Sequence, residues 1–224
     1  MNKHSIAATV VAGAAMLVAG SVQAQSAGTF MLKVGFNNIM PKVESGDLSP
    51  PAPAGSKIDI KSASALILTG TYMITDNIST EFLAGLPYKH DIVGAGAQEG
   101  VGKIGSVHQI SPTLMLQYRF LPPDAVVRPY VGLGATYAVF YDTEGSGTLT
   151  ALTNPGGPPT TIGGDHAFGG TGQIGVSVKL NERLFLDASL MKTYISTHTT
   201  LSTGQTIDAD QDPVAANISI GYRF

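Results

Sequence analysis

The sequence contains no cysteine and no tryptophan, and only 13% of its 224 residues are charged. Without cysteine, the fold cannot depend on the disulfides that stabilise many small exported domains. The formal net charge is −3, and no basic cluster provides the positive surface that a nucleic-acid partner needs. This composition is unusual for a water-soluble domain and points away from nucleic-acid binding.

Long apolar runs are also missing, except near the N-terminus. The chain begins with a short basic segment, continues with an apolar stretch from Ile6 to Val18 and then has small residues. This order is typical of a secretory signal peptide, and the stretch is shorter than the about 20 residues of a membrane-spanning helix. We therefore expect a signal peptide over residues 1–24 and a single domain over residues 25–224. No second run has the length of a spanning helix, which excludes a helical membrane protein.

Short alternating segments are abundant instead. Apolar residues alternate with small or polar ones in eight segments: residues 30–37, 65–74, 78–86, 109–120, 130–141, 171–180, 184–194 and 214–224. The charges in these segments fall on the face opposite the apolar residues: Lys33, Glu81, Arg119, Lys179, Asp187 and Arg223. Lys192 is an exception, and we expect it at the outer rim, where its long side chain can reach polar groups. This period of two predicts transmembrane β-strands with one face toward lipid.

The connections alternate in length. Short polar turns occur at residues 75–77, 121–124 and 181–183, and longer segments rich in Gly, Pro, Ser and Thr lie between them: residues 38–57, 87–107, 142–165 and 198–211. An open sheet edge in lipid would leave backbone groups unpaired, so the strands must close into a barrel. We predict an all-β fold in the bacterial outer membrane: an eight-stranded antiparallel transmembrane β-barrel with short periplasmic turns and longer extracellular loops.

Four segments and the last strand carry a resemblance to a known family. They read LPYKHDI (residues 86–92), GKIG (102–105), PTLMLQYRF (112–120), RPYVGLG (128–134) and a terminal YRF. Together they resemble the OmpW/AlkL family over essentially the whole mature chain, although tryptophan is absent and Ser111 stands where a second proline is common. The resemblance implies a narrow, largely apolar lumen that admits small hydrophobic molecules from outside. It also implies a plugged periplasmic end and a lateral exit into the membrane.

Apolar residues on the inner face are the candidates for lining this passage: Met31, Leu83, Met115, Phe140, Phe185 and Met191. A hydrophobic molecule gains about 25 cal/mol for each Å² of apolar area that it hides from water. Ordinary interior packing is the alternative role for each residue. A wide aqueous pore is excluded, because eight strands leave room for side chains or one small ligand only.

Two further groups of residues are candidate sites. Inner charges near the periplasmic strand ends are expected to form a plug: Arg119, Lys179, Asp187 and Arg223. Buried charges must be paired wherever they lie, so stability alone is the alternative. Pro87, Tyr88 and His90 are candidates for a mouth or gate, with an ordinary surface loop as the alternative. The histidines show no metal-ligand spacing, so we expect no metal and no cofactor.

These patterns predict passive uptake of small hydrophobic molecules, with lateral exit into the membrane. A structural or surface-receptor barrel with a packed lumen is the alternative. A lipid-modifying barrel enzyme is less favoured, because it needs a Ser–His pair backed by an acid, and no such pattern accompanies His198. We therefore expect no enzyme. The expected partners are small hydrophobic molecules, outer-membrane lipid and, through the alternating C-terminal strand, the barrel-assembly machinery. We expect a monomer, because a closed barrel has no free edge.

Overall fold

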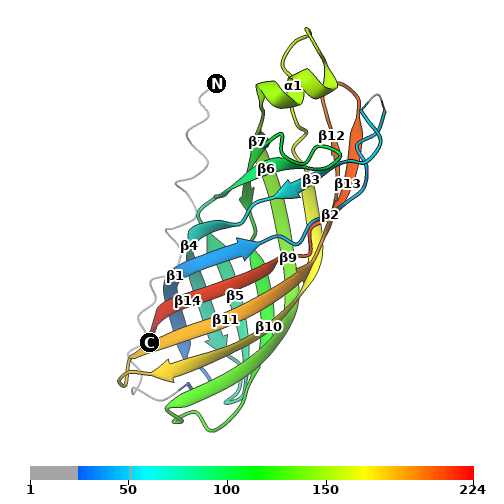
Figure 1. Cartoon of the computed structure of the whole chain (residues 1–224). Coiled ribbons are helices and arrows are strands. Elements are labelled where there is room, and N and C mark those ends of the chain that lie inside the picture. The colour runs from blue at the N-terminus through cyan, green and yellow to red at the C-terminus, as the bar shows by residue number, and fades with distance from the viewer. Residues whose placement is uncertain (1–24, 51) are drawn as a thin grey trace, which may run out of the picture.

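The computed structural model describes residues 25–50 and 52–224, so the predicted signal peptide lies outside the described residues. Eight antiparallel strands form the barrel: β1 (Phe30–Met40), β4 (Ala63–Met73), β5 (Ile78–Gly85), β8 (Thr113–Arg119), β9 (Val127–Gly145), β10 (His166–Lys179), β11 (Leu184–Tyr194) and β14 (Val214–Arg223). They pair in this order, and β14 pairs with β1 to close the wall. The predicted eight-stranded barrel is confirmed (Figure 1).

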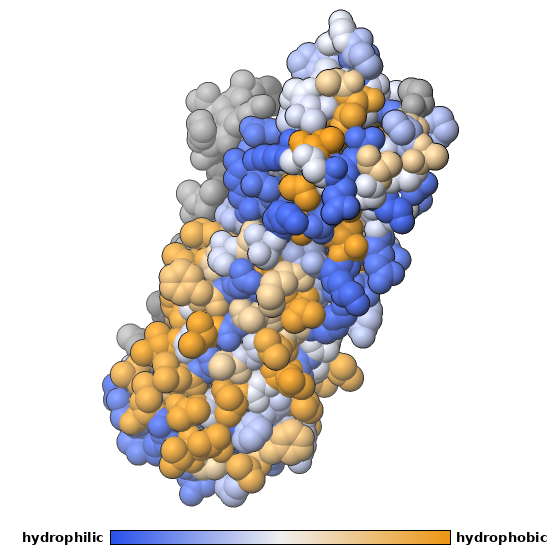
Figure 2. All heavy atoms as spheres, in the orientation of Figure 1, coloured by the Kyte–Doolittle hydropathy of each residue, from blue (hydrophilic) through white to orange (hydrophobic). Residues whose placement is uncertain are grey.

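Side chains alternate between the two faces of the wall. In β1, Val34 and Phe36 are exposed whereas Met31 and Lys33 are buried. Leu133 on β9 is 76% exposed and Ile218 on β14 is 63% exposed, although both are strongly apolar. Figure 2 shows an apolar surface over the lower barrel and a mostly hydrophilic one over the upper part. A continuous belt of exposed apolar side chains matches the hydrocarbon layer of a membrane.

The longer connections are more regular than the sequence suggested. They contain six strands and a helix: β2 (Glu44–Ser45), β3 (Ser56–Ile60), β6 (Tyr88–Gly96), β7 (Lys103–Ile110), α1 (Gly147–Thr153), β12 (Ser196–Thr200) and β13 (Thr206–Asp210). Residues 87–107 are therefore mostly strand, and the other three long connections, residues 38–57, 142–165 and 198–211, contain strand or helix segments of their own. These elements form an extension of the wall above the apolar belt (Figure 1).

Pairing with one long strand explains the extension. The inner part of β9 pairs with β8, and its outer part pairs with β7, which carries β6 and then β3. A separate sheet of β12, β13 and β2 lies in the same region. Buried apolar residues from several of these elements form one cluster, including Ile92, Ile104, Leu149 and Leu201. Tertiary burial therefore orders segments whose composition is typical of loops.

The helix α1 is a small part of the extension. Ser146 caps it by accepting a hydrogen bond from the backbone N–H of Leu149 at 3.2 Å, and the Leu149 side chain is buried in the apolar cluster. Among the described residues, no helix combines the length and apolar character needed to cross a membrane.

Candidate functional site

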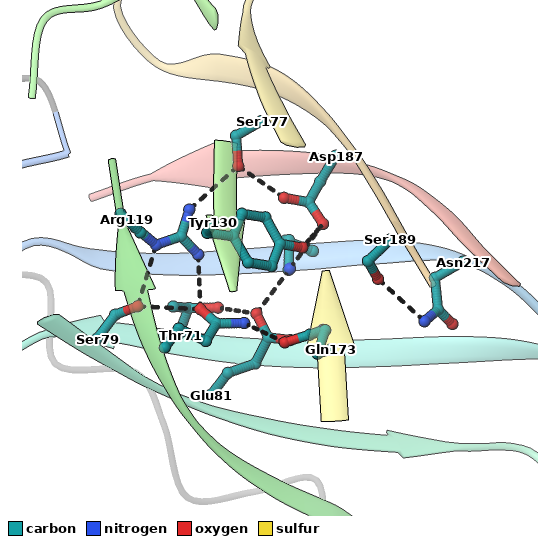
Figure 3. Close-up of polar contacts among 12 residues, drawn as sticks. Thr71, Ser79, Glu81, Arg119, Tyr130, Gln173, Ser177, Asp187, Ser189 and Asn217 are labelled. Carbon is teal, nitrogen blue, oxygen red and sulfur yellow. Dashed lines mark hydrogen bonds and ion pairs between the residues drawn. The ribbon is translucent and has the colours of Figure 1, made fainter. Parts of the chain in front are cut away.

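A network of charged and polar side chains crosses the lower barrel. Lys33 Nζ lies 2.7 Å from Glu81 Oε2 and 3.0 Å from Asp187 Oδ1, and all three side chains are almost fully buried. The three residues come from β1, β5 and β11, so the contacts span the lumen (Figure 3). One ammonium group thus neutralises part of the charge of two carboxylates. Such a cluster is stable only when its members keep their partners.

Neutral groups complete the network around these charges. The Tyr130 hydroxyl donates to Asp187 Oδ1 at 2.9 Å, and Ser177 donates to Asp187 Oδ2 at 2.7 Å. Thr71 and Gln173 donate to the two oxygens of Glu81 at 2.9 and 3.2 Å. The carboxylates are therefore satisfied from several strands, and the polar side chains reach toward one another at this level of the lumen (Figure 3).

Arg119, the last residue of β8, joins the same network from inside the barrel. Its guanidinium donates to Ser79 at 3.0 Å, to Gln117 Oε1 at 2.8 Å and to Ser177 at 3.1 Å. It also lies 4.6 Å from the centre of the Tyr130 ring, a cation–π distance. Arg119 therefore packs against the ring of Tyr130, its register partner on β9, while its hydrogen bonds join it to Ser79, Gln117 and Ser177.

An apolar floor lies on the periplasmic side of this network. Met31, Met73 and Phe185 form a fully buried cluster, and the Arg223 guanidinium lies 5.3 Å from the Phe185 ring centre. A Cβ atom at Gly221 would lie 2.2 Å from the Phe185 ring, so only glycine leaves room for that ring. The packing of Phe185 in the floor thus depends on Gly221, which has no side chain.

Arg128 joins the N-terminal segment to two turns at the lower end of the barrel. It is 1% exposed and donates to the backbone carbonyls of Gln25, Asp76 and Phe120, which belong to the N-terminal segment and two turns. The sequence reasoning did not assign it a role, because it lies where a turn was expected. Its separation of two residues from the inward Tyr130 was the signal that it also faces the lumen.

Above the network the lumen becomes apolar. Ile67, Leu83, Met115 and Met191 pack together at the level that we call the waist. Next to the waist is a cavity of about 40 Å³, the inner pocket, which is lined by Asn37, Ile39, Leu83, Tyr88, Gln109, Ser111, Thr113, Thr136, Ala138, Met191, Thr193, Ile195, Pro213 and Ala215.

A second cavity of about 90 Å³, the outer chamber, lies inside the extension. Its walls are mainly apolar and include Ile58, Ile92, Phe140 and Leu201. Gln109 lines both cavities and therefore marks the boundary between them. The outer chamber, the inner pocket and the waist follow one another toward the polar network.

Tyr88 and His90 face inward from β6 at these levels. Tyr88 lines the inner pocket and His90 lines the outer chamber, and both are at least 98% buried, whereas Pro87 is exposed. Burial raises the pKa of Tyr88 to about 12. It lowers the pKa of His90, whose Nδ1 lies 2.7 Å from the Lys61 carbonyl. Both side chains are therefore uncharged where they line these cavities at neutral pH.

Comparison with known proteins places this architecture in a family. The model of the OmpW family matches residues 26–224. The chain belongs to the OmpW family. Outer membrane protein W of Salmonella typhi is 33% identical over 229 residues, covering 100% of both chains. The dibenzothiophene metabolism operon protein PahQ of Pseudomonas aeruginosa is 25% identical over 173 residues, 76% of each chain.

A solved structure supports the same assignment. The crystal structure of the outer membrane protein OprG from Pseudomonas aeruginosa matches with a TM-score of 0.79 and 27% identity, covering 91% of this chain and 99% of that chain. This OmpW-family protein is therefore an outer-membrane β-barrel, and the resemblance and localisation inferred from its sequence are confirmed.

The OmpW-family barrel divides the six predicted lining residues into three levels. Leu83, Met115 and Met191 meet at the waist, and Phe140 lies in the outer chamber. Met31 and Phe185 lie in the floor, on the periplasmic side of the polar network. A passage that ends at the network would therefore use only four of the six.

The four residues predicted to form the plug do not all lie in the same place either. Arg119, Asp187 and Arg223 are buried in the lower barrel, but Lys179 pairs with Glu182 at 2.8 Å in the adjacent turn, and its side chain is 22% exposed. Lys179 is placed differently because it ends β10, where its long side chain reaches the exposed turn. At the opposite rim, Lys192 bonds to the carbonyl of Asp212, in keeping with its expected position.

Proposed function

We propose that this OmpW-family protein is a passive outer-membrane channel for small hydrophobic molecules. Such a molecule enters the outer chamber, passes Gln109 into the inner pocket and reaches the waist. The observation that carries the proposal is the order of these levels: two mainly apolar cavities followed by an apolar waist, and then a polar network that fills the lumen.

The energetics favour this direction. Apolar walls attract a hydrophobic molecule from water by about 25 cal/mol for each Å² buried. The network below offers charges that are already paired, and breaking those pairs to let a molecule through is costly. The periplasmic route is therefore closed to the cargo. One relative is named for an operon of dibenzothiophene metabolism, and dibenzothiophene is an apolar aromatic compound.

The exit is lateral, through the wall formed by β9, β10 and β11. Met191 lines the inner pocket and also a groove on the lipid-facing surface, which Leu133 and Ile174 border. Gly172 lies in this groove, where an added Cβ atom would meet nothing within 4 Å. A wall with so little side-chain bulk offers the shortest path from the inner pocket to lipid.

Uptake of a hydrophobic fluorescent probe by liposomes that contain the purified protein tests the proposal. Met115→Arg places a charge in the waist and should slow uptake at least about tenfold, because this corresponds to only ~1.4 kcal/mol of added barrier. Met115→Leu keeps the volume and apolar character and should retain uptake. Met191→Arg repeats the test from the other wall, in case Met115→Arg does not fold. A wild-type rate equal to that of protein-free liposomes would contradict the proposal and favour a structural or receptor barrel.

A further inference from the structure

Four threonines form a hydrogen-bonded ladder inside the barrel. Thr113, Thr136, Thr171 and Thr193 lie on the consecutive strands β8, β9, β10 and β11, and their hydroxyl oxygens are 2.9, 2.7 and 3.0 Å apart in that order. All four are buried, and all but Thr171 line the inner pocket. The ladder therefore presents a row of hydroxyl oxygens to the cavity.

The end of the ladder sets the direction of every bond. Thr113 Oγ1 donates to the carbonyl of Ser111 at 3.1 Å, which uses its single proton. Thr136 must then donate to Thr113, Thr171 to Thr136, and Thr193 to Thr171. Three of the four protons are used within the ladder and the fourth on the Ser111 carbonyl, while Thr193 accepts no bond from the ladder. The side that faces the inner pocket is therefore rich in hydrogen-bond acceptors.

A second polar pair faces the same cavity from the opposite wall. Asn37 Nδ2 donates to the Tyr88 hydroxyl at 2.8 Å, and Asn37 is 4% exposed. Among the described residues, Asn37 Oδ1 has no hydrogen-bond partner. Because Tyr88 accepts the bond from Asn37, its own proton remains available. The pair thus offers one acceptor and one donor to whatever occupies the pocket.

The remaining walls limit the chemistry of an occupant. Ile39, Ala138, Ile195 and Ala215 are apolar, and none of the described lining residues carries a charge. The cavity of about 40 Å³ exceeds the ~10–15 Å³ that one water-sized group requires. An ionised group would lack a counter-charge here, and a pure hydrocarbon would leave the buried Asn37 oxygen unsatisfied.

We propose that the inner pocket binds the hydroxyl group of a hydrophobic alcohol, with the apolar body of the molecule in the waist or the outer chamber. A hydroxyl donates one hydrogen bond to Asn37 or the threonine ladder and accepts one from Tyr88. A ketone can only accept, and an alkane can do neither. The inference rests on the proposed channel function and narrows its substrate class to alcohols with apolar bodies.

Menthol, menthone and menthane provide a matched series, because they share one carbon skeleton and carry a hydroxyl, a carbonyl or neither. Their rates of accumulation would be measured in cells that express the full-length protein, each relative to cells without it. We expect the protein to accelerate menthol uptake about five- to tenfold more than menthane uptake, as one or two neutral hydrogen bonds would do, with menthone in between.

Variants that keep nearly the same side-chain shape show which residues produce the advantage of menthol over menthane. Tyr88→Phe removes the donor and Thr193→Val removes the free end of the ladder, so each should reduce the advantage of menthol over menthane to about twofold or less. Thr69→Val is the matched control, because Thr69 is a buried threonine of β4 that does not line the inner pocket. It should leave the advantage unchanged, provided that all variants fold.

The outcomes separate the two proposals. Equal acceleration of all three compounds by the wild type would overturn the hydroxyl subsite and leave the channel in place. An advantage of menthol that survives both Tyr88→Phe and Thr193→Val would also overturn the subsite. No acceleration of any compound would overturn the channel function and, with it, the inference that rests on it.

Discussion

At the scale of single residues, Lys33 is the centre of the polar network. Its ammonium contacts two buried carboxylates at 2.7 and 3.0 Å, so the charge balance of Glu81 and Asp187 depends on it. Lys33→Met should destabilise the folded barrel by about 3–5 kcal/mol, because two buried carboxylates lose their counter-charge. Denaturant unfolding in detergent or lipid would measure this loss.

A triple variant provides the control for Lys33. Adding Glu81→Gln and Asp187→Asn to Lys33→Met removes the uncompensated charges while keeping similar volumes, so most of the lost stability should return. Equal stability of wild type and Lys33→Met would show that the network does not hold the lower barrel together.

Gly221 is a second residue on which the lower barrel depends. Its inner side touches the Phe185 ring, so Gly221→Ala should force the ring to move and cost about 1–3 kcal/mol of unfolding free energy. Gly172→Ala is the control, because a Cβ atom there meets nothing within 4 Å, and its effect should stay within ~0.5 kcal/mol. Similar losses for both variants would point to a general effect of alanine in the strands.

Sequence alone predicted which residues face inward but not which of them meet. Alternation placed Lys33, Glu81 and Asp187 on the inner face, although Lys33 and Asp187 are separated by 154 positions in the chain. Their contact depends on the register between strands, which period-two alternation does not contain. The same limit explains why Met31 was grouped with Met191, although they lie on opposite sides of the network.

At the scale of elements, β6 shows how the extension depends on buried polar residues. His90 on β6 is 99% buried and bonds to the Lys61 carbonyl, next to the start of β4. Its pKa is lowered by burial, below the ordinary value of about 6.5. The unfolded segment therefore binds the proton more tightly than the folded one.

The sign of the pH effect follows from this shift. The stability that neutral His90 contributes is fully present above pH 6.5 and is lost as the pH falls below that value. Amide hydrogen exchange of β6 and β7 should therefore accelerate as the pH falls below about 6.5. His90→Asn keeps a neutral donor near the Nδ1 position and should remove most of this dependence. A wild-type exchange profile without pH dependence, after correction for intrinsic exchange, would contradict the assignment.

The eight barrel strands were predictable because most of them alternate clearly between residues that face the membrane and residues that face the lumen. The elements of the extension were not, because glycine, proline, serine and threonine are common in their sequences. Residues 88–92 still alternate, with Tyr88, His90 and Ile92 facing inward, and this was the available signal for β6. That alternation spans only a few residues, and the pairing of β6 with β7 and β3 becomes evident only in three dimensions.

At the scale of the whole molecule, the outer surface and the lumen change between apolar and polar character at different heights along the barrel. The apolar belt covers the lower barrel, and the hydrophilic extension encloses the outer chamber above it (Figure 2). The polar network lies within the lower barrel, so a molecule that reaches the waist is surrounded by wall strands that face lipid. This arrangement favours exit into the membrane over passage to the periplasm.

The central claim is that the lumen passes hydrophobic molecules but not hydrophilic ones. The most direct test places a hydrophobic probe and a sugar of similar size on the same liposomes containing the protein and measures both fluxes together. The account predicts accelerated entry of the hydrophobic probe, and a sugar flux equal to that of protein-free liposomes. Sugar flux that rises in proportion to probe flux would show an aqueous pore through the network, and would contradict the account.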